Sequence, residues 1–317
     1  MINLLNWFET KAAAKRSARA GAGLAVPVAQ AERARPALDH AAANRAYAGY
    51  TLSFAAGPQE IVEAQRLRYK VFAEEMGAKL DTPVAEHDAD EFDPYCEHLL
   101  VRDARSTRVV GTYRLLPPEH ARRIGRLYSE REFDLSRLVH LRERMVEAGR
   151  ACVHWEHRNG TVIMLLWSGI ARYMQRYGYA YLGGCASISL RDGGHSAANL
   201  YLGLRETQLA APEYRVFPKL ALPVERLAAA GMTGQTAAAA AASNEIRAGT
   251  SAATSAAIAA TPAPGAVMDM PPLIKGYLRV GAKVAGAPAW DPDFNSADLF
   301  MLLPMQQLSP RYARRFT

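Results

Sequence analysis

The spacing of apolar and polar positions predicts a strand and then a helix at the start of the well-patterned part of the chain. Residues 50–55 alternate as a strand with one buried face does. Residues 58–76 instead carry apolar side chains every three to four positions, which is typical of an amphipathic helix. Pro58 is suited to the first turn of that helix, and Gly77 is suited to its end.

The pattern continues in the same way up to about residue 204. It predicts strands at 98–102, 109–116, 148–155 and 179–189, a helix at 161–177 and a short helix near 197–204. The first two of these strands are close enough in sequence to form a hairpin, whereas the strand–helix–strand unit at 148–189 requires a parallel crossover. We therefore predict an α/β fold with a mixed central sheet flanked by helices.

Two segments lack this patterning. Residues 1–49 are basic and mostly alanine-rich, and residues 228–267 are an alanine-rich, low-complexity stretch without an aromatic residue. Neither offers enough apolar surface to offset the entropy cost of ordering. We predict a poorly ordered N-terminal extension at 1–49 and one domain at 50–317, interrupted by an insertion at 228–267.

The first eight residues allow two interpretations. One is a simple tail, and the other is a short amphipathic membrane anchor in which Leu4, Leu5, Trp7 and Phe8 face lipid. No window approaches 18 uninterrupted apolar residues, and the charged residues follow the apolar cluster instead of preceding it as in a secretory signal. The expected location is the cytoplasm, and the anchor interpretation adds peripheral contact with the inner membrane.

Composition and charge narrow the function classes. The three cysteines are too few and too scattered for a disulfide framework or a zinc site, so no metal is expected. The net charge is +7, but the charges are distributed unevenly along the chain. Residues 57–97 hold 4 basic and 11 acidic side chains, whereas residues 98–191 hold 16 basic and 8 acidic ones. An acidic segment next to a basic one could form a site that binds a cation and an anion together. It could equally form two solvated surfaces of opposite charge. No nucleic-acid motif occurs, which weighs against a non-enzymatic nucleic-acid-binding module.

Several motifs follow one another in order along the chain: Arg68-Tyr-Lys-Val-Phe72, Asp90-Glu-Phe-Asp93, Val110-Gly-Thr-Tyr-Arg114, Tyr128-Ser-Glu, Gly149-Arg-Ala-Cys-Val-His154 and Asp291-Pro-Asp-Phe-Asn-Ser-Ala-Asp298. Together they resemble the bacterial L-ornithine N-alpha-acyltransferases of ornithine-lipid synthesis. The resemblance covers residues 50–226 and 269–316. It implies a GNAT-like fold and transfer of a 3-hydroxyacyl group from acyl carrier protein to the α-amine of L-ornithine, giving lyso-ornithine lipid.

The chain also resembles, more distantly, the acyl-homoserine-lactone synthases. The positions that match their pattern are Arg68, Phe72, Asp90, Asp93, Arg114, Glu147 and Arg150. The tryptophan expected shortly after the phenylalanine is missing, since Met76-Gly-Ala78 stands there. That departure argues against lactone chemistry, but an enzyme of this type, or an acyltransferase for another amino acid, is the alternative function.

Amide formation requires an amine without its extra proton and stabilisation of the developing oxyanion. We assign Asp90 and Asp93 to amine binding or to ordering of the acidic loop, and we expect buried Arg114 to pair with one of them. Our hypothesis gives Glu147 the role of proton acceptor and Arg150 that of ordering the loop. The alternative for these last two residues is a purely structural ion pair with other elements.

The acyl thioester is expected between the strands that carry residues 152–154 and 181–187, which splay apart in GNAT-like folds. A backbone N–H near Val153 or His154 would then be the oxyanion donor, and Cys185 and Ser187 would line the substrate side. Cys152 is interpreted as a core residue. Residues 157–162 hold only one glycine before the helix, which weakens a coenzyme A donor. We therefore expect no separate cofactor, because acyl carrier protein brings its own phosphopantetheine.

Overall fold

A computed structural model describes residues 45–229 and 270–308 of the chain. The predictions for the N-terminal extension, apart from residues 45–49, and for the alanine-rich insertion, apart from residues 228 and 229, lie outside the described residues. Among those residues, no helix is both long and apolar enough to cross a membrane.

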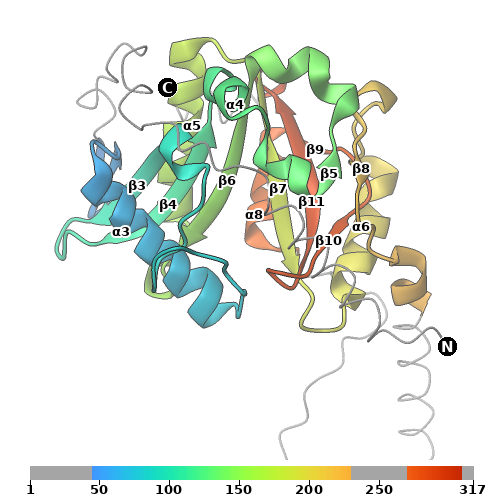
Figure 1. Ribbon diagram of the computed structural model, residues 1–317, viewed down its shortest axis with the longest axis horizontal. Helices are drawn as coiled ribbons and strands as arrows, with labels where there is room; N and C mark the ends of the chain where they lie inside the picture. Colours follow the sequence, from blue (N-terminus) through green and yellow to red (C-terminus); the bar gives the residue numbers. More distant parts are fainter. Residues whose placement is uncertain (1–44, 230–269, 309–317) are drawn as a thin grey trace, which may run out of the picture. The chain divides into compact units, whose positions relative to one another are not determined.

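The described residues form a nine-stranded mixed sheet (Figure 1). Its strands are β1 (Arg45–Tyr47), β2 (Tyr50–Phe54), β3 (Glu97–Asp103), β4 (Val109–Leu116), β6 (Met145–Val153), β7 (Tyr181–Ser189), β9 (Lys283–Val284), β10 (Ala289–Asp291) and β11 (Ser296–Pro304). Their spatial order is β1-β2-β3-β4-β6-β7-β11-β10, with β9 on β11. β6 and β7 pair in parallel and the other neighbours are antiparallel. The predicted mixed sheet and its parallel crossover are confirmed, and β1 extends the sheet five residues before the predicted domain start.

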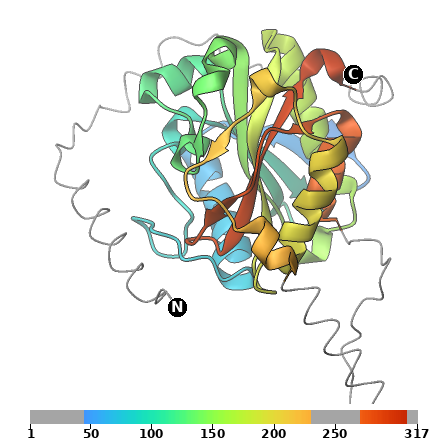
Figure 2. The same ribbon diagram turned by 90° about the vertical axis from the view of Figure 1, so that its right-hand side faces the viewer.

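Helices cover the sheet and connect its strands. The α-helices are α3 (Pro58–Tyr69), α4 (Pro118–Ile124), α5 (Thr161–Tyr177), α6 (His195–Thr207) and α8 (Pro272–Val280). The short 3-10 helices are η3 (Asp93–Tyr95), η4 (Tyr128–Arg131), η5 (Ser136–Arg144), η6 (Trp155–His157), η7 (Pro212–Tyr214) and η8 (Met305–Gln307), and β5 (Phe133–Asp134) pairs with β8 (Phe217–Pro218) as a separate ribbon. In Figure 1, α3 lies in front of β3 and β4, and α5 lies behind them. α8 packs against β11 (Figure 2).

α3 shows how the predicted local pattern becomes structure. Pro58 starts the helix, and its buried face carries Ala64, Leu67 and Arg68. The helix runs directly into a π-helical turn, η2 (Lys70–Glu75), before Gly77 adopts a φ of +76°. The sequence predicts the extent of this helix correctly but not its π-helical end, which places Phe72 toward the cavity described below.

β6 and β7 begin side by side and then separate. Their pairing is limited to Met145–Glu147 of β6 and residues 181–183 of β7, although both strands are nine residues long. At the point of divergence Gly184 has a φ of +156°, and a Cβ there would lie 2.1 Å from the carbonyl oxygen of Ala148. The predicted separation of these two strands is therefore present, and it depends on a glycine at its apex.

β6 also contains a bulge. Thr112 pairs with Cys152, whereas Arg114 pairs with Gly149, so β6 has one more residue than β4 between these pairs. The extra residue brings Arg150 to a φ of +53°, which is an unusual conformation for a side chain other than glycine. The bulge turns the Arg150 side chain toward the acidic loop described next.

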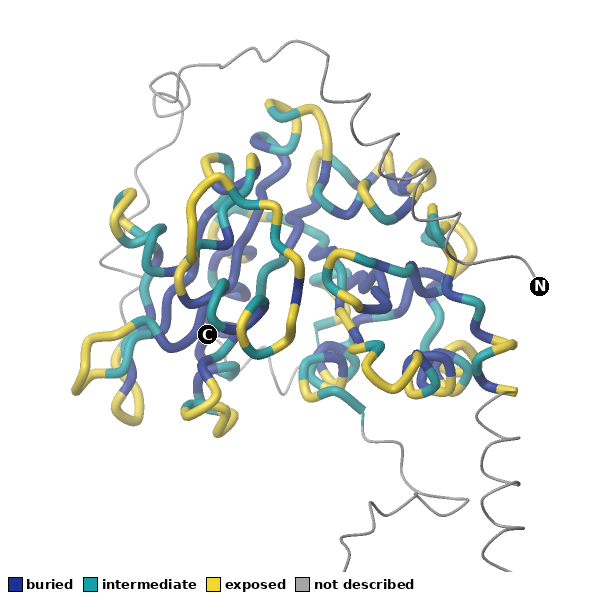
Figure 3. The backbone as a smooth tube through the Cα atoms, turned by 60° about the horizontal axis from the view of Figure 1, so that its bottom comes forward, coloured by how far each residue is buried: buried dark blue, intermediate teal, exposed yellow. Residues whose placement is uncertain are grey.

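The buried residues follow the strands of the sheet, and the exposed ones are concentrated in the connections (Figure 3). One cluster of buried apolar side chains contains Phe92, Phe133, Leu138 and Phe300. β11 is buried at every position from 296 to 303. A strand with both faces covered shows no apolar–polar alternation, which explains why periodicity alone did not indicate it.

Candidate active site

The acidic loop between η2 and β3 is tied to the domain by buried arginines. Arg68 of α3 has no exposed surface, and its guanidinium donates to both carboxylate oxygens of Asp93, with Nη1–Oδ1 at 3.0 Å and Nη2–Oδ2 at 2.7 Å. Its Nε lies 2.9 Å from Oδ2 of Asp88. Arg68 and Asp93, two predicted substrate-binding residues, therefore face each other and not an open site.

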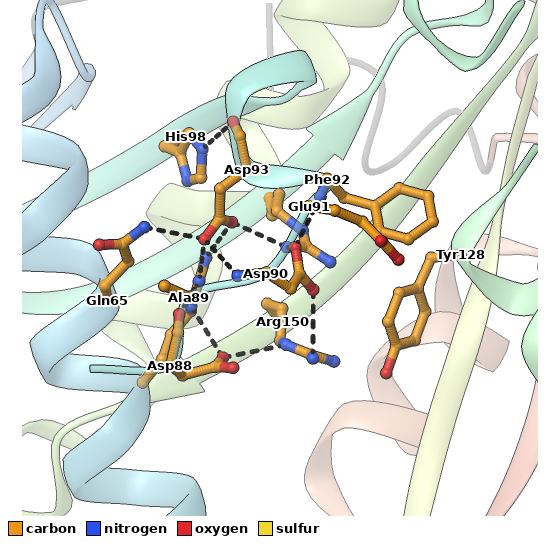
Figure 4. A network of polar contacts seen from close by, with 12 residues as sticks. Gln65, Asp88, Ala89, Asp90, Glu91, Phe92, Asp93, His98, Tyr128 and Arg150 are labelled. Carbon is orange, nitrogen blue, oxygen red and sulfur yellow. Dashed lines mark hydrogen bonds and ion pairs between the residues drawn. The ribbon is translucent and has the colours of Figure 1, made fainter. Parts of the chain in front are cut away.

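Two further arginines complete this network (Figure 4). Arg114 Nη1 lies 2.6 Å from Asp90 Oδ1 and 2.7 Å from Asp93 Oδ1. Arg150 Nε lies 2.9 Å from Asp88 Oδ2, and its Nη2 lies 3.4 Å from Asp90 Oδ2. Three aspartates are thus interleaved with three arginines, and we call these six residues the Asp–Arg network. The expected pairing of Arg114 is confirmed.

The network keeps the carboxylates of Asp90 and Asp93 ionised. Burial alone would raise the pKa of Asp93, but Arg68 and Arg114 hold that pKa far below its usual range. The pKa of Asp90 is also lowered, because Arg114 and Arg150 outweigh the effect of burial. Carboxylates whose charge is already matched by buried guanidinium groups are poor partners for an additional ammonium group.

A cavity of about 610 Å³ opens where β6 and β7 separate. The predicted residues that line it are Phe72, Arg114, Glu147, Arg150, Val153, Cys185 and Ser187; Arg68, Asp90, Asp93 and His154 are not among its lining residues. Its wall thus combines apolar side chains with charged ones. A cleft of this size and mixed character suits an acyl chain attached to a polar acceptor.

Glu147, on β6, is buried and points its carboxylate at η4. Its Oε2 accepts the backbone N–H of Tyr128 at 2.6 Å, and its Oε1 accepts that of Ser129 at 2.7 Å. Burial nevertheless raises the pKa of Glu147. The ring of Tyr128 lies 4.7 Å from the Arg150 guanidinium, so Glu147 holds in place the turn that covers Arg150. The proton-acceptor role assigned to Glu147 remains a prediction.

The two candidate oxyanion donors, the backbone N–H groups of Val153 and His154, point in different directions. The His154 N–H donates to the Val110 carbonyl at 2.8 Å, so it is engaged in the sheet. Hydrogen-bonded and non-hydrogen-bonded residue pairs alternate along two antiparallel strands. Because this bond makes His154 and Val110 a hydrogen-bonded pair, the neighbouring pair of Val153 and Gly111 is a non-hydrogen-bonded one. Successive amides of a strand point to opposite sides, so the Val153 N–H is directed away from β4 and toward the side of the cavity.

The thiols near the site do not have the character of nucleophiles. Cys152 is buried in an apolar cluster with Leu67 and Phe72, and burial raises the pKa of its thiol. Burial likewise raises the pKa of Cys185 well above its ordinary value, and its Sγ donates to Ser129 Oγ at 3.3 Å. Cys96 also lines the cavity, and burial raises the pKa of its thiol to about 12. All three thiols stay protonated near neutral pH, so none is suited to form an acyl-enzyme.

Two carboxylates in the cavity received no role from the sequence. Asp298 of β11 and Asp291 at the end of β10 both line it, and they are 5% and 6% exposed. Burial and the neighbouring Asp291 raise the pKa of Asp298 to about 6. Both residues belong to the motif at 291–298 quoted above. This motif is far from Glu147 in the sequence, so the sequence gave no sign that the three residues share a cavity.

One further group has the composition of a metal site. Ligand atoms of His154, Glu156 and His157 lie within 4.8 Å of one another. However, the Lys70 ammonium lies 3.1 Å from Nε2 of His154, and burial together with Lys70 lowers the pKa of that histidine. A lysine ammonium this close disfavours a second cation, so we assign no metal here.

Comparison with known proteins places this site in a family. A family profile described as "Acetyltransferase (GNAT) domain" matches residues 67–168. The L-ornithine N(alpha)-acyltransferase of Brucella abortus is 35% identical over 261 residues, covering 80% of this chain and 83% of the relative. That of Rhodobacter capsulatus is 33% identical over 282 residues, covering 84% and 95%. The chain belongs to the L-ornithine N(alpha)-acyltransferase family. The family and the GNAT fold predicted from the motifs are therefore confirmed, and the chain is an acyltransferase.

Solved structures were also found at low similarity. TofI in a ternary complex with an inhibitor and MTA is 15% identical, with a TM-score of 0.41 over 83% of this chain and 96% of that one. The CoA-dependent acyl-homoserine lactone synthase BjaI with SAM and isopentyl-CoA is 15% identical, with a TM-score of 0.40 over 81% and 82%. Such scores add nothing to the assignment of substrate.

Proposed function

We propose that this acyltransferase moves a 3-hydroxyacyl group from acyl carrier protein to the α-amine of L-ornithine and forms lyso-ornithine lipid. The observation that carries the proposal is the cavity between the separated β6 and β7 strands, found in a chain of the L-ornithine N(alpha)-acyltransferase family. The cavity joins an apolar lining to buried carboxylates. It can therefore take a fatty thioester and a cationic amine together.

The strand geometry supports the donor half of the proposed reaction. A pantetheine arm between the diverging strands would place the thioester carbonyl near the Val153 N–H, which faces away from β4. That N–H would stabilise the oxyanion as the amine attacks. Since all three thiols that line the cavity stay protonated, we propose direct attack on the thioester with no covalent intermediate.

The carrier-protein donor is supported by the cavity mouth. Arg158 and Arg191 both line the cavity and both contact Glu75, with Arg158 Nη2 at 2.5 Å from Oε2 and Arg191 Nη2 at 2.7 Å from the backbone carbonyl. Two arginines suit the single phosphate of phosphopantetheine. The segment before α5 has one glycine, Gly160, instead of the glycine-rich loop that cradles a pyrophosphate.

The test is a reconstitution with pure protein. It is incubated with 3-hydroxyacyl–acyl carrier protein, or with the coenzyme A thioester of the same acyl group, and with each of a panel of amino acids. Mass spectrometry should detect N-acylornithine, formed faster from the carrier protein. Product from another amino acid only, or lactone from S-adenosylmethionine, would contradict the proposed acceptor. Faster transfer from the coenzyme A thioester would contradict the proposed donor.

The amphipathic product gives the proposal a location. We propose that the reaction occurs in the cytoplasm, with peripheral contact at the inner membrane, because lyso-ornithine lipid must pass from the cavity into a bilayer. Flotation of the full chain with anionic phospholipid vesicles tests this contact. Failure of the chain to float at low salt would contradict it.

A further inference from the structure

The wall of the cavity contains a carboxylate that is placed to act on a bound amine. Asp298 lies on β11 opposite Ser187 of β7, in the region where β7 has already left β6. Its Oδ1 lies 3.1 Å from Oγ of Ser296, and Ser187 also contributes a side-chain hydrogen bond. Both serines line the cavity, so hydroxyl groups hold Asp298 at the cavity wall.

In the part of the chain that the structure describes, no cation forms a direct ion pair with this carboxylate. Among residues 45–229 and 270–308, no lysine or arginine lies within 4.0 Å of Asp298 or of Asp291. Arg150 acts on both from a greater distance, but its own ion pairs are with Asp88 and Asp90. Two buried like charges beside a cavity are stabilised by an ammonium group that enters it.

Glu147 is less suited to the same task. Each of its carboxylate oxygens accepts a short bond from a backbone N–H of η4, at 2.6 and 2.7 Å. A proton taken up by Glu147 would weaken bonds that order Tyr128 and Ser129. Asp298 is held by hydroxyl groups, which can rotate and accept as well as donate. It can therefore gain and lose a proton without releasing a turn of the backbone.

We propose that Asp298 is the general base that takes a proton from the attacking amine, that Asp291 positions the ammonium group beside it, and that Glu147 is a positioning residue for η4. This inference rests on the proposed function. The acceptor enters as an ammonium ion, since an α-amino group is mostly protonated at pH 7. One proton passes from its nitrogen to the Asp298 carboxylate, and the neutral nitrogen forms the new C–N bond to the thioester carbonyl carbon.

The remaining steps balance without another reactant. The C–S bond breaks as the tetrahedral intermediate collapses, and the sulfur leaves with the electron pair. The second proton lost by the nitrogen goes to that sulfur and gives the free thiol. Asp298 then releases its proton to solvent. One ammonium ion and one thioester thus give one amide, one thiol and one proton.

The surroundings of Asp298 suit a base that works near neutral pH. The titratable and charged groups that act on it or on its neighbours come from several elements: Asp291 from β10, Arg150 and Glu147 from β6, Cys185 from β7, Tyr128 from η4, and Asp293 and Glu132 from connecting segments. Burial and Asp291 raise its pKa to about 6, against the opposing effects of the serine hydroxyls and Arg150. A general base is most effective when its pKa lies near the working pH.

The first test compares turnover of three variants under saturating acyl carrier protein and ornithine. D298N should lower kcat by about 10²–10⁴-fold, the usual contribution of a general base. D293N is the matched control, because Asp293 belongs to the same motif but is exposed. It should keep a rate near that of the wild type, and E147Q should lose far less turnover than D298N. Wild-type turnover by D298N, or a larger loss in E147Q than in D298N, would overturn the assignment.

The second test does not depend on turnover. In protein labelled with ¹³C-aspartate, one carboxyl signal should titrate near pH 6 and be missing from D298N. A wild-type protein without any such signal would overturn the inference. If the wild type acylates no ornithine, the proposed function fails, and the titration still decides whether Asp298 can act as a base. If the wild type is active and D298N equally so, only the inference fails.

Discussion

Two groups of buried carboxylates lie close together in this acyltransferase and differ in their partners. Asp88, Asp90 and Asp93 alternate with three arginines in the Asp–Arg network. Asp291 and Asp298, which line the cavity, have no arginine or lysine within 4.0 Å in the described part of the chain. The pKa of Asp93 is far below its ordinary value, and that of Asp298 is raised to about 6.

The difference shows how buried aspartates can serve either to stabilise the fold or to take part in the reaction, depending on their partners. A carboxylate matched by guanidinium groups stays ionised, is expensive to disturb and cannot readily bind another cation. A carboxylate buried without such a partner destabilises the fold when ionised, but it can bind an ammonium group or accept its proton. The first group orders the acidic loop, and we propose that the second performs the reaction.

Breaking the paired group should give the largest effect on stability. D93N leaves Arg68 and Arg114 without their shared counter-charge, so the free energy of unfolding should fall by about 3–5 kcal/mol. The control is E91Q on the same loop, whose side chain is 49% exposed and pairs with exposed Arg126 and Arg131. It should change that free energy by about 0–1 kcal/mol. Denaturant unfolding measures both, and equal losses would contradict the structural role of the network.

An intermediate effect is expected where β6 and β7 separate beside the unpaired group. G184A introduces a Cβ 2.1 Å from the Ala148 carbonyl oxygen at a φ of +156°. The strands must shift, and the free energy of unfolding should fall by about 2–3 kcal/mol. G149A is the control, because nothing lies within 4 Å of a Cβ at that position. Thermal unfolding of both variants is the measurement, and an unshifted midpoint in G184A would contradict the close approach.

Removing charge from the unpaired group should raise the free energy of unfolding, and this change should be smaller than the two losses described above. Since the pKa of Asp298 rises from 3.8 to about 6 on folding, its ionised form destabilises the folded protein above pH 6. This shift corresponds to about 3 kcal/mol, and the weaker hydrogen bonds of an amide to Ser187 and Ser296 should offset part of it, so D298N should raise the free energy of unfolding by about 2 kcal/mol at pH 8. This gain should shrink as the pH falls through 6 and vanish below about pH 4. Urea unfolding at pH 8 and pH 5 measures it, and a destabilised D298N at pH 8 would contradict the account.

The fold could be predicted largely from local patterns. Helix α5, closed by Gly178, and strand β2, which is buried at alternate positions, follow from periodicity. β3 and β4 are buried on both faces, but the short connection between them and the prolines after β4 indicated a hairpin. β11 could not be found in this way, because both of its faces are buried. The bulge that places Arg150 at a positive φ arises from strand pairing, so it leaves no local signal.

The site was predicted less completely. Motif matching selected Arg68, Asp90 and Asp93 together, and the structure brings them together as ion pairs. A sequence shows which residues are charged but not whether a charge is already matched by a neighbour. The residues left unmatched, such as Asp298, lie on a strand more than 140 positions after Glu147 in the sequence. Only the three-dimensional arrangement distinguishes the two groups.

The pH dependence of kcat/KM for ornithine tests the division between the two groups most directly. For the wild type, kcat/KM should fall tenfold per pH unit below about pH 6, as Asp298 becomes protonated. D298N should be slower throughout and show no such acidic limb, while E147Q should retain it. An acidic limb that is unchanged in D298N would contradict the account, because another group would then accept the proton.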